Sequence, residues 1–288
     1  MSDTELIKEN EEWSMVISPK NNWFDLNLKD VWRYRDLLFM FVKRDFVSIY
    51  KQTILGPLWF LIQPILTTAM FIVVFKNVAK IPTDGIPPAL FYLSGLTIWN
   101  YFSTCITKTS TTFVSNASIF GKVYFPRLIM PLSNVVSNLI AFAIQLALLI
   151  TFMVWYAFHG YVFHFSKYLL LIPVIIILLA AMGLGIGIII SSLTTKYRDL
   201  SFLITFGIQL LMYATPVIYP LSYLSDKYKT FILLNPITPL IEIFRLAILG
   251  TGTFNIWYLL YSIVFAILSL IFGIMIFNQV EKSFMDTV

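Results

Sequence analysis

Long apolar runs alternate with short polar segments along most of the chain. A helix needs about 20 predominantly apolar residues to cross the hydrocarbon core of a bilayer. Six uncharged runs approach this length, at residues 58–75, 90–106, 132–158, 168–193, 202–218 and 256–277. The pattern predicts an all-α polytopic membrane protein with six transmembrane helices, in a domain that covers residues 57–278.

The segment in front of the first span, residues 28–56, is amphipathic. Charged residues interrupt it, whereas Phe39, Val42, Phe46 and Ile49 are spaced to share one face of a helix. Basic residues beside an apolar stripe favour a helix that lies in the cytoplasmic headgroup layer. A helix packed on a cytoplasmic partner is the alternative, and the two arrangements are compatible.

Gly56 and Pro57 separate this amphipathic helix from the first span. Glycine adopts backbone conformations that other residues avoid. Proline fits the first position of a helix, because its missing N–H would have no partner there. We therefore interpret Gly56-Pro57 as an elbow where the chain turns from lying on the membrane to crossing it. Pro64, inside the first span, is expected either to kink that helix or to be accommodated by neighbouring helices.

Composition and charge support the membrane assignment. The chain is 58% apolar and 12% charged, whereas soluble domains carry roughly 25% charged residues. Most of the 20 Lys and Arg residues fall on one side if the N-terminus is placed in the cytoplasm. Both termini are then cytoplasmic, with an extension at residues 1–27 and a tail at residues 279–288. This distribution explains the net charge of +5 without nucleic-acid binding.

No motif in the sequence supplies catalysis or binds a nucleotide. The GxxxxGK[ST] phosphate loop, the HExxH zinc motif and the GxSxG nucleophile motif do not occur. His159 and His164 share one short loop that offers too few partners for a zinc site. The single Cys105 excludes an intramolecular disulfide and a cysteine metal cluster. We therefore expect no catalytic residue, cofactor or metal ion on this chain.

The predicted spans are almost free of charge. Ion-coupled transporters usually place carboxylates inside the membrane, so an active transporter of this kind would take its energy from another chain. Gly183, Gly185 and Gly187 lie in the fourth span. We interpret them as small residues that allow close helix packing, because no strand precedes them as in a nucleotide-binding fingerprint.

The predicted cytoplasmic loop at residues 107–131 combines a helix cap with aromatic and basic side chains. Candidates for the cap are Ser115, Asn116 and Ser118. Tyr124 and Phe125 are bulky anchors, and Lys122 and Arg127 can pair with carboxylates. Such a loop suits docking into the cleft of a partner protein. The alternative is an ordinary loop anchored by side chains that reach the headgroup layer.

Residues 215–245 form the long external segment, which is apolar although it contains four prolines. Its pieces are too short to span but suit helices that dip into the outer leaflet and return. Irregular backbone at membrane depth needs cover from protein or a water-filled cavity, which suggests an outer gate. Glu242 and Arg245 are spaced i, i+3 and can form a local pair. Simple charge neutralisation is the alternative.

Several motifs resemble the membrane subunits of polysaccharide-exporting ABC transporters, the group of O-antigen, capsule and teichoic-acid exporters. They are FVKRDFVSIYKQTILGPLWFLIQP at residues 41–64, KVYFPR at 122–127, YRDL at 197–200, TPVIYP at 215–220 and NPITPLIEIFR at 235–245. They occur in the family's order and cover about residues 31–282. Leu128 departs from the family, where an acidic residue commonly follows Pro-Arg, and this puts one polar contact with the cytoplasmic partner in doubt.

The resemblance implies a homodimer of six-span subunits in the inner membrane, with two separate ATP-binding-cassette chains that hold ATP and Mg²⁺. The substrate would be an undecaprenyl-type lipid-linked polysaccharide, moved outward between the two subunits. The implied ATPase-coupling residues are Ser118, Lys122, Tyr124, Phe125 and Arg127. The implied gate residues are Pro216, Tyr219, Pro220, Asn235, Pro236 and Pro239.

Arg44 and Lys51 are candidates to attract the lipid pyrophosphate at the mouth of the first span. Their alternative role is to anchor the cytoplasmic side of the membrane domain. O-antigen is the first expectation for the cargo, with capsule and teichoic acid as alternatives. An ABC exporter of small hydrophobic molecules is a more distant alternative, and a membrane-embedded transferase lacks the convergent acidic or histidine residues that it would need.

Overall fold

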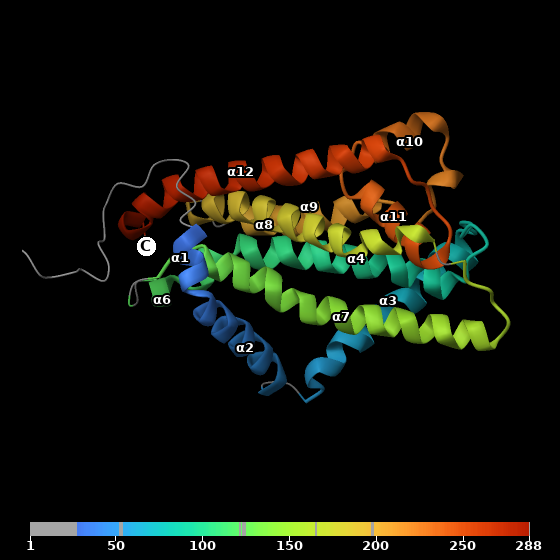
Figure 1. The fold of residues 1–288 in the computed structure, drawn as a ribbon, viewed down its shortest axis with the longest axis horizontal. Helices are drawn as coiled ribbons and strands as arrows, with labels where there is room; N and C mark the ends of the chain where they lie inside the picture. The colour runs from blue at the N-terminus through green and yellow to red at the C-terminus, as the bar shows by residue number, and fades with distance from the viewer. Residues whose placement is uncertain are drawn as a thin grey trace, which may run out of the picture.

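The computed structural model describes residues 28–51, 54–120, 122, 125–164, 166–196 and 199–287. In this part of the chain the regular secondary structure is helical, with no strand. The longest helices run side by side along one axis, and shorter elements cover the two ends of the bundle (Figure 1). The expected extension at residues 1–27 lies outside the described residues.

Four long helices build the bundle: α4 (Pro88–Ser110), α7 (Ile129–Phe158), α8 (Ile172–Lys196) and α12 (Ile256–Thr287). The N-terminal elements are α1 (Leu28–Arg33), α2 (Arg35–Lys51), the 3₁₀ turn η1 (Gly56–Leu58), α3 (Trp59–Phe71) and the π-helical η2 (Ile72–Val78). The remaining elements are α5 (Thr112–Ser115), α6 (Ala117–Phe120), η3 (Lys167–Leu171), α9 (Leu200–Tyr213), η4 (Leu221–Tyr223), α10 (Asp226–Leu233) and α11 (Thr238–Leu249). Figure 1 places α1 and α6 at one end of the bundle, and α10 and α11 at the opposite end.

Within the described residues, four helical segments are long and apolar enough to cross a membrane. They are Gly56–Val78, Ile129–Phe158, Lys167–Thr194 and Ile256–Gln279, and a fifth results if the bent pair α10–α11 is counted as one span. These segments match the first, third, fourth and sixth predicted spans. The all-helical membrane architecture is therefore confirmed, whereas the number of six spans stays a prediction.

The second and fifth predicted spans are helical in the structure, but neither is among these long apolar segments. Helix α4 covers the second and is 23 residues long, but it is the buried centre of the bundle and carries buried Ser and Thr side chains. Helix α9 covers the fifth and has only 14 residues, about 21 Å of helix. It ends at Tyr213 instead of Ile218, because Thr215 precedes Pro216 and a residue before proline disfavours the helical conformation.

Helix α2 packs along α7, and only part of the predicted apolar stripe faces the bundle. Val42 and Phe46 are half-buried, as are Leu38 and Phe41. These four positions follow the i, i+3, i+4, i+8 spacing of one helix face. Phe39 remains 61% exposed, and the side chain of residue 49 lies outside the described set. The face of α2 that contacts the bundle is therefore displaced from the predicted stripe, and it includes Leu38 and Phe41 in place of Phe39.

Gly56 and Pro57 lie where the chain turns from α2 into α3. Gly56 is buried and has a φ of 49°, in the left-handed region that disfavours a side chain. Pro57 occupies the start of η1, where its missing N–H leaves no helical hydrogen bond unmade. Figure 1 shows α2 and α3 as the two arms of a V that meet beside the bundle. Pro64 lies inside α3 and is buried.

The glycines of the fourth predicted span allow α8 to fit between two helices. Gly183 and Gly187 are one turn apart and face α4. A Cβ atom at Gly183 would lie 2.7 Å from Cys105 Cβ, and one at Gly187 would lie 2.5 Å from Thr109 Cβ. Both separations are too short for two carbon atoms, so only glycine allows this approach.

The opposite face of α8 meets α12 at equally close range. A Cβ atom at Gly185 would lie 2.5 Å from the carbonyl carbon of Ser269, and one at Gly273 would lie 2.7 Å from the Gly185 oxygen. Small residues let helix backbones approach in a membrane, where van der Waals packing drives helix association. The interpretation of these glycines as packing residues is confirmed.

The Gly185→Ala substitution is expected to lower the thermal unfolding temperature of the purified protein in detergent. The added methyl group meets rigid α12 backbone, and overpacking of this kind typically costs about 1–3 kcal/mol. Gly207→Ala on α9 is the matched control, because a Cβ atom there has nothing within 4 Å. Its unfolding temperature should stay the same or rise, since alanine favours helix over glycine by about 1 kcal/mol. Equal effects of the two substitutions would contradict the packing role.

Candidate functional site

The predicted coupling loop lies at the end of the bundle that also carries α1. It contains two one-turn helices, α5 and α6, between α4 and α7. Ser118 and Lys122 are exposed, and Arg127 is half-buried with its guanidinium 5.9 Å from the centre of the Phe120 ring. Tyr124 lies outside the described residues. The exposed Ser118 and Lys122 are therefore accessible from the end of the molecule.

Phe125 points into its own chain. It is 4% exposed, and its ring centroid lies 5.7 Å from those of Phe41 and Phe120. The contacts continue from Phe120 to Phe113 at 5.9 Å, and from Phe113 to Phe277 at 5.1 Å. Instead of offering an aromatic anchor to a partner, Phe125 joins the loop to α2 and, through this row of rings, to α12.

Among the described contacts, none of the three candidate side chains accepts a hydrogen bond at the start of a helix. The Asn116 side chain instead donates its Nδ2 hydrogen to the Thr112 carbonyl oxygen at 2.9 Å, and so closes α5. Asn134 of α7 donates to Thr112 Oγ1 at 2.9 Å and to the Lys108 carbonyl at 3.3 Å. The base of the loop is thereby attached to both α4 and α7.

The two basic residues predicted at the substrate entrance lie on α2. Arg44 forms an ion pair with Asp45, with 2.8 Å between Arg44 Nη2 and Asp45 Oδ1, and its guanidinium lies 4.8 Å from the centre of the Phe41 ring. Lys51 is exposed two turns further along the helix. Part of the charge of Arg44 is therefore compensated by Asp45, whereas Lys51 faces outward at the elbow.

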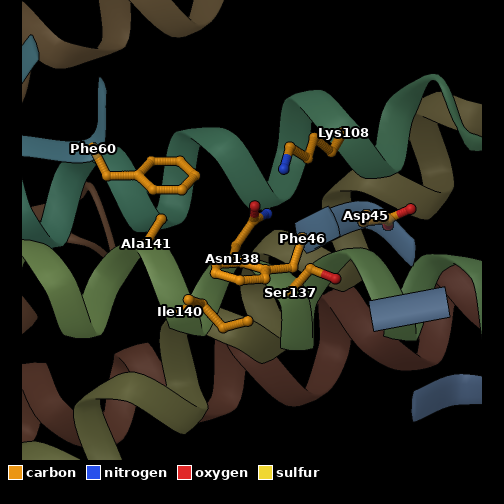
Figure 2. Close-up of a pocket in the computed structure, with 8 residues that line it drawn as sticks. All are labelled: Asp45, Phe46, Phe60, Lys108, Ser137, Asn138, Ile140 and Ala141. Carbon is orange, nitrogen blue, oxygen red and sulfur yellow. The ribbon is translucent and has the colours of Figure 1, made fainter. Parts of the chain in front are cut away.

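A small cavity lies between α2, α3, α4 and α7. It measures about 10 Å³ and is lined by Asp45, Phe46, Phe60, Lys108, Ser137, Asn138, Ile140 and Ala141. Figure 2 shows the Lys108 amino group directed toward the Asn138 amide. A cavity of this size holds about one water molecule. It is too small for a sugar or a pyrophosphate, so it is not a substrate site.

The predicted gate residues converge at the opposite end of the bundle, where α10 and α11 meet at an angle of 100°. Pro216 and Pro220 are buried, and Pro239 is buried at the start of α11. The Tyr219 hydroxyl donates to the Tyr213 carbonyl oxygen at 2.9 Å. The Ser262 hydroxyl of α12 donates to the Pro236 carbonyl oxygen at 2.7 Å.

Asn235 connects the beginning of the predicted gate segment, residues 215–245, to the residues in front of α11. Its Nδ2 donates to Thr215 Oγ1 at 3.0 Å and to the Ala214 carbonyl at 3.3 Å. Its Oδ1 accepts the Ile237 N–H at 3.1 Å. The amide thus serves as donor and acceptor at once, and it joins the residues after α9 to those before α11.

The buried centre of the predicted gate segment is the pair formed by Glu242 and Arg245. Arg245 Nη1 lies 3.9 Å from Glu242 Oε1, which confirms the expected i, i+3 pair. Sequence reasoning did not foresee its burial: Arg245 is 2% exposed and Glu242 5%. The available signal was the only Glu-x-x-Arg in an otherwise uncharged apolar segment, TPLIEIFRLAIL.

Known proteins resemble this chain over most of its length. The O-antigen export system permease protein RfbA of Klebsiella pneumoniae is 30% identical over 251 residues, which cover 87% of this chain and 94% of the relative. The Myxococcus xanthus protein of the same name is 27% identical over 76% of this chain and 82% of its own. The polysialic acid transport protein KpsM of Escherichia coli is 22% identical over 85% and 93%.

The ABC-2 type transporter family matches residues 36–249. This range begins in α2 and ends with α11, so it includes the elbow, the loop with α5 and α6, and the whole gate segment. The resemblance read from the motifs is confirmed at the level of the family. Because the match covers most of its residues, the chain belongs to the ABC-2 type transporter family.

Proposed function

We propose that this chain is the membrane subunit of an ATP-driven exporter that moves a lipid-linked polysaccharide, O-antigen in the first instance, outward across the inner membrane of a bacterium. The observation that carries the proposal is the 30% identity to an O-antigen export permease over 94% of that relative's length. The relative named for polysialic acid transport is 22% identical, and makes a capsular polysaccharide the second candidate.

The proposed arrangement contains two copies of this chain, each with six spans and both termini in the cytoplasm. Helix α2 lies in the headgroup layer, where its exposed Phe39 and Met40 beside exposed Lys43 suit an interfacial position. The cavity of about 10 Å³ within one chain is far too small for a sugar polymer. The polymer therefore passes through a channel between the two copies, where more space is present than inside one chain.

The energy in this proposal comes from two ATP-binding chains, which hold ATP and Mg²⁺. They contact the end of the bundle that exposes Ser118 and Lys122. Phe125, with neighbours on α2 and α6, passes their movement into the membrane domain. This assigns two tasks within one loop: polar residues contact the partner, and the buried aromatic residue transmits the displacement.

Inactivation of this chain in its bacterium should abolish surface polysaccharide while the polymer accumulates on its lipid carrier inside the cell. The reason is that synthesis of the polymer does not require the exporter. Surface polymer is measured with a specific antibody and intracellular lipid-linked polymer by extraction, with complementation by the wild-type chain as the control. Loss of capsule with intact O-antigen would identify the second candidate, and unchanged levels of both polymers would reject polysaccharide export.

Reversing the charge at Lys122 and Arg127, with Lys122→Glu and Arg127→Glu, should weaken co-purification of the ATP-binding chain or uncouple its ATP hydrolysis from export. Each substitution replaces an attraction to partner carboxylates by repulsion at the same place. Lys227→Glu on exposed α10 is the matched control at the opposite end of the bundle. Normal assembly and coupling in both variants would remove these two residues from the partner interface.

The double substitution Arg44→Gln and Lys51→Gln should slow export of lipid-linked polymer by about tenfold or more, the factor for about 1.4 kcal/mol of lost attraction. Assembly with the ATP-binding chain should be unchanged. Lys51→Gln is expected to carry most of the effect, because Arg44 is paired with Asp45. The measurement is the rate at which polymer appears at the surface, at matched amounts of inserted protein. Normal rates would leave the two residues with a purely anchoring role.

A further inference from the structure

Arg245 is a completely buried cation that binds backbone of the gate segment. Its Nη1 donates to the Pro216 carbonyl oxygen at 2.6 Å, and its Nη2 to the Val217 carbonyl oxygen at 3.1 Å. These residues follow α9, whereas Arg245 belongs to α11. The segment has four prolines, which donate no backbone hydrogen bonds. Its position therefore depends on contacts of this kind.

The same guanidinium also binds the outer third of α4. Nη2 donates to the Phe91 carbonyl oxygen at 3.3 Å, and Nε lies 3.5 Å from Ser94 Oγ. The guanidinium carbon lies 3.8 Å from the centre of the Phe91 ring. Gly95 leaves room for it, since a Cβ atom there would lie 2.7 Å from Arg245 Nη2. One side chain thus joins α11, the Pro216–Val217 turn and α4.

The charge of the buried Arg245 is balanced by a carboxylate that is itself held by hydrogen bonds. Glu242 provides the opposite charge, and its Oε2 accepts from the N–H and hydroxyl of Thr253 at 3.2 and 3.3 Å. At the rim of the same segment, the Ser222 hydroxyl donates to Asp84 Oδ1 at 2.6 Å. A buried cation of this kind is tolerated only with excellent geometry and satisfied hydrogen bonds.

Helix α4 runs without interruption from Arg245 to the coupling loop. Its 23 residues span about 34 Å. At its far end, Asn134 of α7 donates to the Lys108 carbonyl oxygen, and Thr194 of α8 donates its hydroxyl to the Ser110 carbonyl oxygen at 2.9 Å. Phe113 follows directly and belongs to the row of aromatic rings. The two ends that carry the predicted sites are therefore joined by one helix.

We propose that Arg245 is the positioning residue that locks the outer gate segment to α4, so that the gate opens only when α4 moves relative to α11. The proposal rests on the proposed function, because it assigns the regulation of that exporter's outer gate. In the locked arrangement the guanidinium holds the Pro216 and Val217 carbonyls against the Phe91–Gly95 turn of α4. Movement that begins at the coupling loop reaches these contacts along α4 and separates them.

The test measures the passive leak of radiolabelled sucrose from proteoliposomes that contain the permease with its ATP-binding chain, without ATP. Arg245→Lys keeps the charge but cannot bind three carbonyl oxygens in a planar fork. Gly95→Ala keeps both charges and displaces the guanidinium. Both variants are expected to leak at least about tenfold faster than wild type, the factor for one lost charge-assisted hydrogen bond.

The double variant Glu242→Gln, Arg245→Met removes the buried pair without leaving an unpaired charge, and it should leak as well. Gly207→Ala, in open space on α9, is the control and should match wild type. Thermal unfolding of each complex is measured beside the leak. Variants that unfold like wild type and leak like wild type overturn the lock. If none of the variants assembles, Arg245 has a role in folding only, and this result also overturns the lock.

The sucrose leak requires no polysaccharide, so it separates this inference from the proposed function. A wild-type complex that fails to move any lipid-linked polymer rejects the proposed function, while the comparison of leak rates still decides whether Arg245 holds the gate closed. Conversely, normal polymer export by tight Arg245→Lys and Gly95→Ala complexes would support the exporter and reject the lock.

Discussion

A guanidinium inside an apolar bundle must find acceptors, and this constraint determines how the end of the bundle with α10 and α11 is arranged. Removing an unpaired ion from water costs several kcal/mol even after relaxation of the protein. Arg245 avoids this penalty with three backbone carbonyls, the Phe91 ring and Glu242. Each acceptor belongs to a segment that has to be in place, so α4, α11 and the turn after α9 are positioned together.

The opposite end of the bundle, which carries α1 and α6, is organised by apolar contacts. Phe41, Phe125, Phe120, Phe113 and Phe277 form a row of neighbouring rings that joins α2, the loop with α5 and α6, and α12. Aromatic pairs of this kind add about 0.5–1.5 kcal/mol each beyond the area that they bury. The two ends therefore differ in chemistry: directional hydrogen bonds hold the predicted gate segment, and packed rings hold the loop. In the proposed exporter, α4 is the rigid connection between them.

Several features could be read from local sequence because they depend on local rules. The Gly-x-Gly-x-Gly pattern places Gly183 and Gly187 on one helix face and Gly185 on the other, and the structure uses both faces for close packing. Gly56 and Pro57 lie at a turn for the backbone reasons that were anticipated. Phe125 shows the limit of this reasoning, because a bulky residue next to basic ones fits an exposed anchor and a buried one equally well.

The sequence by itself determined the class of the protein: helical, embedded in a membrane, and a member of a transporter family through motifs spread along the chain. Apolar periodicity, proline and glycine positions, and charge distribution report on single segments, so they are sufficient for this. Only the tertiary structure decided that the polar centre of α4 is buried, that Phe125 faces inward, and that Glu242 and Arg245 are enclosed. These outcomes depend on which segments meet across more than a hundred residues, as between Phe91 and Arg245. No local pattern carries that information, because burial is a property of the assembled bundle.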